Sequence, residues 1–250
     1  MCTIVFASRV FDDFHTVICG NRDEEYSRGF HPPETREVSG TRMLAPRDEK
    51  KGGTWIGFNE EGVAAALSNL PEVTDSSDCR EPRSRGLLCR DILGCSTVRE
   101  AREVVEGIDD LYRGFNLVVA GKKGCFVAVY DGELEVRKAR WGVVTNSEFT
   151  EPDQKTRRVS KMTPNPEKHE AREWIKKVKE ILRSHDPEVC VHGENKGTTS
   201  SSMIAVSSNA DESVYFFADG RACESSYREI KVGGGVRFRL TVCEVYLSRS

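Results

Sequence analysis

The chain opens with Met1-Cys2-Thr3-Ile4-Val5-Phe6, and a second apolar run, Val17-Ile18-Cys19-Gly20, leads into Asn21-Arg22-Asp23-Glu24. Both runs favour β-structure and Asp12-Asp13 between them is typical of a turn, so residues 2–8 and 15–20 are expected to form a hairpin. Removal of Met1 would leave Cys2 with both a thiol and a free α-amino group. Such an amine titrates at about pH 7.7–8.0 in model peptides and can serve as a base for its own side chain. The stretch predicts an N-terminal-nucleophile enzyme in which Cys2 is the nucleophile.

The composition is that of an ordinary globular protein, and we expect one domain over residues 1–250. The chain has 37 Lys and Arg against 40 Asp and Glu, which gives a net charge of −3 and argues against a nucleic-acid partner. No apolar run is long enough for membrane insertion, and no secretory leader is recognisable. The nine cysteines form no C-x-x-C pair, so we predict a reduced, cytoplasmic protein without a metal site.

The remaining segments alternate between strand-like and helix-like patterns. Residues 25–51 are polar and carry three prolines, so they are expected to form a long surface loop, such as a lid over an active site. The segment 193–202 is rich in glycine and serine, and the strand pattern that follows it begins only at residue 203. Strand patterns cover residues 55–58, 63–67, 115–120, 125–130, 133–138, 142–145, 203–207, 213–218 and 236–247, and helix patterns cover two segments within 84–108 and residues 171–182.

The order of these segments predicts the fold class. Strands come first, then a helix pair, more strands, a helix and final strands. Regular alternation of strand and helix would indicate a parallel α/β fold, and it is absent here. We therefore expect an α+β protein, a four-layer αββα sandwich of two mainly antiparallel sheets.

Several polar residues lie where strands are expected to end. Asn21-Arg22-Asp23-Glu24 follows the second strand, and Asn69 and Asn146 each end an apolar run. Ordinary turn chemistry explains each of them singly, and Cys2 could equally be a small core residue. An Asn amide can also stabilise a tetrahedral oxyanion by about 3–4 kcal/mol. A Cys–His dyad that uses His15 or His31 is a further alternative.

The motifs in order resemble the NRDE family, also called the transport-and-Golgi-organisation family. They are Met1-Cys2-Thr3, Asn21-Arg22-Asp23-Glu24, Gly52-Gly53-Thr54-Trp55-Ile56-Gly57, Leu67-Ser68-Asn69, Ser84-Arg85-Gly86, Gly114-Phe115-Asn116-Leu117 and Thr145-Asn146-Ser147. That family is distantly similar to choloylglycine hydrolases and penicillin V acylases, which share an αββα fold and a processed Cys nucleophile.

The resemblance implies a role for each candidate residue. Cys2 would be the nucleophile and Asp23 would orient its amine. Asn69 would donate to the oxyanion, and Asn146 would support the nucleophile and the oxyanion. Arg22 would orient substrate or thiolate. The chain departs from those hydrolases in having Arg22 and Asp23 adjacent, and in having no Arg at Lys196-Gly197-Thr198-Thr199-Ser200, where they place one late in the chain.

Two functions follow from the resemblance. The favoured one is an amidohydrolase or acyltransferase that acts on an amide or acyl-thioester bond of a small molecule and requires no cofactor. The alternative is a non-catalytic binding or trafficking protein, with haem, lipid or acyl-CoA as ligand, since eukaryotic relatives are associated with Golgi organisation and secretion. The oligomeric state has no signature in the sequence.

Overall fold

The first of two sheets is built around the N-terminal hairpin. The structure is a computed structural model that describes residues 2–71, 81–109, 111–233 and 239–243. Sheet 1 has seven antiparallel strands in the order β10-β1-β2-β11-β12-β13-β14. Their bounds are β1 Thr3–Ser8, β2 Thr16–Glu25, β10 Trp141–Val144, β11 Lys196–Val206, β12 Val214–Asp219, β13 Arg228–Gly233 and β14 Arg239–Cys243.

The second sheet follows the chain order without a crossover. Sheet 2 also has seven antiparallel strands, in the order β3-β4-β5-β6-β7-β8-β9. Their bounds are β3 Phe30–Val38, β4 Thr41–Asp48, β5 Ile56–Asn59, β6 Ala64–Asn69, β7 Phe115–Gly121, β8 Gly124–Tyr130 and β9 Leu134–Lys138.

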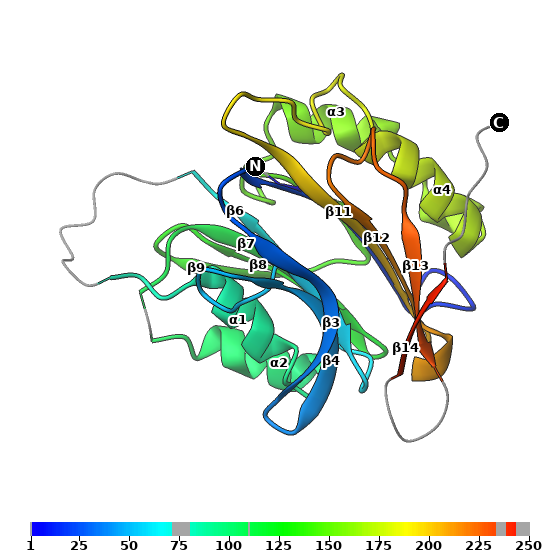
Figure 1. The fold of residues 1–250 in the computed structure, drawn as a ribbon. Helices are drawn as coiled ribbons and strands as arrows, with labels where there is room; N and C mark the ends of the chain where they lie inside the picture. Colours follow the sequence, from blue (N-terminus) through cyan, green and yellow to red (C-terminus); the bar gives the residue numbers. More distant parts are fainter. Residues whose placement is uncertain (1, 72–80, 110, 234–238, 244–250) are drawn as a thin grey trace.

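Helices cover the outer face of each sheet, which makes four layers (Figure 1). Helices α1 (Arg85–Ile92) and α2 (Val98–Glu106) pack on sheet 2, and α3 (Gln154–Met162) and α4 (Ala171–Leu182) pack on sheet 1. Two 3₁₀ turns, Pro166–Lys168 and Ala210–Glu212, complete the elements. Among the described residues, no helix has the length and apolar character needed to cross a membrane.

Three apolar cores hold the layers together. Phe6 and Ile18 of sheet 1 meet Phe58 of sheet 2 in the core between the sheets. Val5 and Cys19, the neighbours of those residues in the sequence, point the other way and pack against α4. Because both faces of these strands are buried, their sequences are continuously apolar rather than alternating. The third core lies between sheet 2 and helices α1 and α2.

The predicted αββα sandwich of two antiparallel sheets is confirmed. The N-terminal hairpin, the hairpin of β5 and β6, strands β7 to β9, the helix pair and α4 all lie where their patterns predicted them. Thr97 caps α2 as the sequence indicated, because its hydroxyl accepts a hydrogen bond from the Glu100 N–H. Of the predicted strand 236–247, residues 239–243 form β14 and the rest lie outside the described residues.

Four corrections concern individual segments. Residues 25–51 are not a loop or a lid, because most of them form the β3–β4 hairpin. Strand β3 is the edge of sheet 2, and its register shifts between His31 and Glu34, so the edge tolerates Pro32 and Pro33 there. The Gly/Ser segment lies largely in β11, whose hydroxyls are buried in the centre of sheet 1. Helix α3 and strand β13 were not anticipated.

The fourth correction concerns the polar quartet. Asn21, Arg22, Asp23 and Glu24 do not follow β2 but form its last part, paired with β11. The first three of them are buried. Buried polar side chains in a central strand require hydrogen-bond or ion-pair partners within the protein, and these partners surround the candidate active site.

Candidate active site

A pocket of about 340 Å³ opens where the ends of β1 and β2 face β6 and the start of α1. Cys2, Arg22, Asp23 and Asn69 all line it. Asn146 lies directly beside them, bonded to Cys2. The structure therefore brings together all five candidate residues, from the N-terminal hairpin, the end of β6 and the segment after β10. Among the described lining residues there is no histidine, so neither His15 nor His31 is placed for a Cys–His dyad.

Asn146 fixes the main chain of Cys2. The Cys2 N–H donates to the Asn146 Oδ1 over 2.9 Å, and the Asn146 Nδ2 donates to the main-chain oxygen of Asn69. The sheet register explains the first contact. Strands β1 and β10 are antiparallel and pair Ile4 with Val144, so Cys2, two residues before Ile4, lies opposite Asn146, two residues after Val144. The Asn146 amide thus ties the start of sheet 1 to the end of β6 in sheet 2.

Two buried polar side chains hold the backbone on either side of Asn146. The Asn116 Nδ2 donates to the Ser147 carbonyl over 2.9 Å and to the Thr145 carbonyl over 3.3 Å. The Ser68 hydroxyl donates to the same Thr145 carbonyl. These contacts hold the residues on either side of Asn146, so its amide has little freedom to rotate away from Cys2. Asn116 and Ser68 lie within motifs that the sequence analysis noted, but it gave them no role.

The environment of the Cys2 thiol pulls its pKa in two directions. Burial raises the pKa of Cys2 above its ordinary value and the Asp23 charge adds to that rise, while the Asp23 backbone N–H, which donates to the sulfur, and the Arg22 charge lower it. Burial dominates, so the resting thiol is protonated at neutral pH. A nucleophilic role therefore needs a base close to the sulfur.

Asp23 is a buried carboxyl held by the neighbouring strand. The Thr198 hydroxyl of β11 donates to the Asp23 Oδ1 over 2.6 Å. Burial raises the pKa of Asp23 to about 6, and the Thr198 hydrogen bond opposes that shift. Asp23 is thus ionised at neutral pH and close to its protonation range in mild acid. Thr198 belongs to the segment where the sequence showed no late Arg, and its hydroxyl is the group that holds the carboxyl.

Arg22 crosses from sheet 1 to sheet 2. Its guanidinium lies 4.6 Å from the Trp55 ring centroid and 5.3 Å from that of Phe30. It donates to the Thr199 hydroxyl over 2.9 Å and lies 3.5 Å from an Asp48 carboxylate oxygen. With 4% of its side chain exposed, Arg22 is a fixed charge beside Cys2 rather than a mobile surface group.

The rest of the pocket wall is strongly basic. Seven cationic and four acidic side chains line it, and they come from β2, the chain around β3 and β4, the segment that leads into α1, and the residues before β7. The cationic ones are Arg22, Arg28, Lys50, Lys51, Arg83, Arg85 and Arg113. Short ion pairs such as Arg28 with Asp48 at 2.7 Å and Lys51 with Glu81 at 3.0 Å use part of this charge, and a net positive charge is left.

This basic wall is not recognisable in the sequence. Its members are scattered over residues 22–113, and basic residues are distributed throughout the chain. The one available signal was Ser84-Arg85-Gly86, which was recognised as a family motif and was given no function. Gly86 lies close to the chain after β4: a Cβ there would lie 3.2 Å from the Thr54 carbonyl oxygen, and the Gly86 carbonyl accepts a hydrogen bond from the Thr54 N–H.

Comparison with known proteins identifies relatives by sequence. A family model described as Transport and Golgi organisation 2 matches residues 1–217. The Transport and Golgi organization protein 2 homolog of Homo sapiens is 32% identical over 132 residues, which is 49% of this chain and 45% of that protein. The corresponding Bos taurus protein is 29% identical over the same shares of the two chains. The match thus spans less than half of the length of these curated relatives.

Solved structures show the same fold at low sequence identity. Penicillin V acylase from Agrobacterium tumefaciens has a TM-score of 0.56 at 14% identity and is aligned over 98% of both chains. A conjugated bile acid hydrolase from Clostridium perfringens has a TM-score of 0.58 at 14% identity over 100% of this chain and 99% of the other. The Caenorhabditis elegans ortholog of N-acylethanolamine-hydrolyzing acid amidase has a TM-score of 0.58 at 15% identity, over 85% of this chain and 96% of the other. The architecture is therefore the N-terminal-nucleophile hydrolase fold.

Proposed function

This chain belongs to the Transport and Golgi organisation 2 family, and on that premise we propose that it is an N-terminal cysteine amidohydrolase or acyltransferase. The observation that carries the proposal is the convergence of Cys2, Asp23 and Asn69 on one pocket, with Asn146 bonded to the main-chain nitrogen of Cys2. That nitrogen becomes the α-amine once Met1 is removed.

In the proposed reaction the Cys2 thiol gives its proton to the α-amine, and its sulfur attacks the carbonyl carbon of an amide or thioester. The new S–C bond forms a tetrahedral oxyanion, for which the Asn69 side-chain amide is the proposed donor. Collapse breaks the C–N or C–S bond of the substrate, and the ammonium returns the proton to the leaving group. Water, or an acceptor amine or alcohol, then releases the acyl group from Cys2.

The remaining residues have positioning roles in this proposal. The Asn146 amide already contacts the Cys2 nitrogen and the Asn69 carbonyl, so it is proposed to orient the amine and to fix the strand end that carries Asn69. Asp23 is proposed to hold the ammonium form of the amine. Arg22 is proposed to stabilise the thiolate, since its charge is among the causes that lower the Cys2 pKa.

The basic wall supports a substrate class as well. With a net positive pocket lining, the favoured substrate carries an anionic group, such as a carboxylate or a phosphate, several ångströms from its scissile carbonyl. Arg85 and Arg113 are proposed to receive that group. Arginine forks match the geometry of both anions.

Intact-mass analysis and thiol labelling test the enzyme proposal. The purified protein is expected to lack Met1, and a reactive acyl thioester is expected to add one acyl group at Cys2. Cys2→Ala should abolish this labelling. Cys95→Ala should retain it, because Cys95 is buried under α1 and does not line the pocket. Retention of Met1 in protein that is nonetheless acylated at Cys2 would refute the role of the α-amine.

The same basic pocket favours a second candidate function, the non-catalytic binding of an anionic ligand such as acyl-CoA or haem. Thermal-shift titration with acyl-CoA and spectral titration with haem test it. Saturable binding that survives in Cys2→Ala, with no acyl-enzyme or turnover in the unmodified protein, would favour this candidate over the enzyme. The absence of a saturable response to either ligand would count against it.

A further inference from the structure

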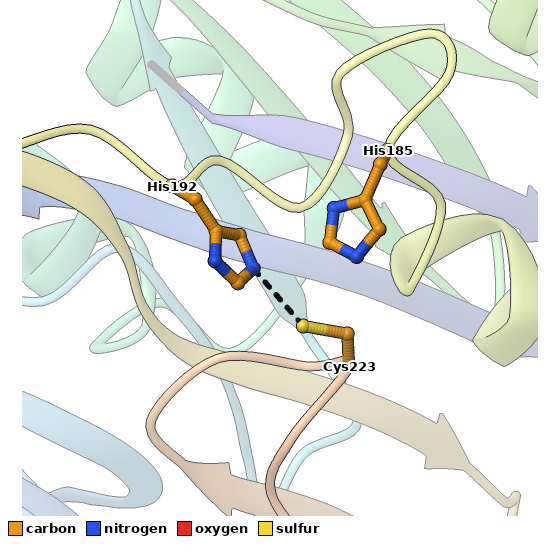
Figure 2. Close-up of side chains that lie close together, drawn as sticks. All are labelled: His185, His192 and Cys223. Carbon is orange, nitrogen blue, oxygen red and sulfur yellow. Dashed lines mark hydrogen bonds between the residues drawn. The ribbon is translucent and has the colours of Figure 1, made fainter.

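A cluster of metal-binding side chains lies outside the pocket, at the end of sheet 1 beyond α4. His185 and His192 come from the segment between α4 and β11, and Cys223 comes from the turn after β12 (Figure 2). One potential ligand atom from each of the three lies within 4.8 Å of the others. The cluster has no role in the proposed reaction. Cys223 comes 31 residues after His192, so no zinc-ligand spacing is recognisable in the sequence.

Cys190 supplies a fourth side chain of the same kind. Its Sγ lies 3.4 Å from the Cys223 Sγ and 3.8 Å from the His192 Nε2, and the His192 Nε2 lies 3.1 Å from the Cys223 Sγ. In a tetrahedral zinc site with Zn–S of about 2.3 Å and Zn–N of about 2.0 Å, neighbouring ligand atoms are about 3.3–3.8 Å apart. The three observed distances are close to this range of ligand-to-ligand distances. A disulfide would require the two sulfurs to be about 2.05 Å apart.

Each imidazole also has an oxygen near its Nδ1, within hydrogen-bond distance for His185 and slightly beyond it for His192. The His192 Nδ1 faces the Glu224 carboxylate at 3.9 Å, while its Nε2 faces the two sulfurs. The His185 Nδ1 lies 3.3 Å from the Cys190 carbonyl oxygen, which leaves its Nε2 for coordination. Carboxylate or carbonyl contacts of this type fix the tautomer and the ring orientation of a ligating histidine. Both His residues are exposed, and their rings contact each other edge to face with centroids 4.8 Å apart.

We propose that Cys190, Cys223, His185 and His192 bind one zinc-class divalent cation. Two thiolates and two imidazoles are a donor set suited to zinc, and four protein ligands leave no open position for substrate or water. The site is therefore structural. It runs against the expectation from the sequence that the chain has no metal site, which rested on ligand spacing alone.

The proposed ion would fasten the segment that supports Asp23. Val191, between two of the ligands, donates its N–H to the Thr198 hydroxyl over 2.9 Å and accepts the Thr198 N–H over 3.0 Å. The Thr198 hydroxyl in turn donates to Asp23. Asn21 contacts the same segment through the Val189 carbonyl at 3.0 Å. The ion thus holds the outer side of the strand pair that carries the candidate site.

Metal titration of the reduced, metal-free protein tests this proposal directly. We expect saturable binding of one Zn²⁺ per chain, and with Co²⁺ the absorption bands of a tetrahedral thiolate site. His192→Gln and Cys223→Ser should each weaken binding by at least about tenfold, and Glu224→Gln should weaken it by about tenfold through the outer contact. The control His31→Gln removes a half-buried histidine from β3, outside the cluster, and should bind as the unmodified protein does.

Thermal unfolding gives an independent readout that does not involve catalysis. Saturating Zn²⁺ should raise the melting temperature of the unmodified protein and of His31→Gln, and should not raise that of Cys223→Ser. If neither ion binds saturably to the unmodified protein, or if His192→Gln and Cys223→Ser both bind with full affinity, the site does not exist. A Cys190–Cys223 disulfide in protein purified under reducing conditions would also overturn the proposal. None of these outcomes bears on whether Cys2 is a nucleophile.

Discussion

At the residue scale, the candidate site depends on how the protein treats buried polar groups. Arg22 and Asp23 are adjacent in β2, and their side chains have different partners. Asp23 receives the Thr198 hydroxyl, whereas Arg22 is enclosed by the Trp55 and Phe30 rings and a carboxylate. Burial of an acid and a base in one strand costs stability unless each has partners. The protein keeps both, which is typical of a functional site.

The first prediction concerns the pH dependence of stability. Because burial raises the pKa of Asp23 from 3.8 to about 6, the folded state binds more protons than the unfolded state between those values. The free energy of unfolding should therefore fall as the pH rises through that range, by up to about 3 kcal/mol from this residue. Asp23→Asn cannot ionise and should lose this contribution.

Urea unfolding at several pH values measures the effect. The stability of Asp23→Asn relative to the unmodified protein should increase between about pH 4 and pH 7. The variant should also be acylated at Cys2 more slowly than the unmodified protein. Replacement of the exposed Asp12 by Asn is the control. A stability difference that does not change with pH would show that the Asp23 carboxyl is not perturbed by burial.

At the scale of elements, a close contact between two backbones shapes the pocket. Gly53, after β4, lies against Gly86 at the start of α1, and a Cβ on Gly53 would come within 2.7 Å of the Leu87 nitrogen. The Thr54 N–H donates to the Gly86 carbonyl over 2.9 Å at the same place. Glycine is required here for the close approach, and Arg83 and Arg85, near Gly86 in the sequence, line the pocket.

Gly53→Ala should therefore push α1 away from sheet 2. The expected cost is about 3 kcal/mol in the free energy of unfolding, since backbone atoms rather than a flexible side chain must move. Reactivity of Cys2 toward an anionic reagent should fall at the same time. Gly124→Ala is the matched control, because its nearest neighbour is a Val98 methyl at 3.8 Å and there is room for the methyl group. Equal stability of the two variants would contradict the close approach.

At the scale of the whole molecule, the pocket is a junction between the two sheets. Arg22 spans that junction from β2 to the Trp55 and Phe30 rings. Arg22→Lys keeps the charge but loses the planar fork and the stacking, and should lower the free energy of unfolding by about 1–3 kcal/mol. Denaturant unfolding measures it against Arg158→Lys, an exposed Arg paired with Asp186. Similar small losses in both variants would mean that Arg22 does not connect the sheets.

The electric field of the pocket is also a property of the whole molecule. Iodoacetate and iodoacetamide have similar size and differ in charge, so the ratio of their rates with Cys2 reports the local potential. Lys50→Glu should lower the ratio of iodoacetate to iodoacetamide by about threefold to fivefold at low salt, and added salt should reduce the effect. Lys176→Glu, on the exposed face of α4, should leave the ratio unchanged. An unchanged ratio in Lys50→Glu would contradict a basic pocket.

The sequence alone determined the elements whose residues pack against near neighbours. The apolar runs of β1 and β2 and the periodicity of α4 are local signals, and they led to the αββα sandwich. The motifs also supplied the five candidate residues, because Cys2, Asn69 and Asn146 lie at strand ends. Strands β3, β4 and the first part of β11 were not predicted from the sequence. Their polar residues resemble those of a loop, and they form strands because neighbouring strands supply hydrogen-bond partners.

Only the tertiary structure decided which side chains meet. Thr198 binds Asp23 across 175 residues, and Cys2 meets Asn146 across 144. The basic wall and the Cys190–Cys223 cluster also join segments that no spacing rule connects. The physical reason is that strand pairing brings distant segments into register, and a hydrogen bond or a ligand set depends on that register rather than on distance along the chain. Cys2 could be identified as a candidate from the sequence, but the residues that contact it are known only from the tertiary structure.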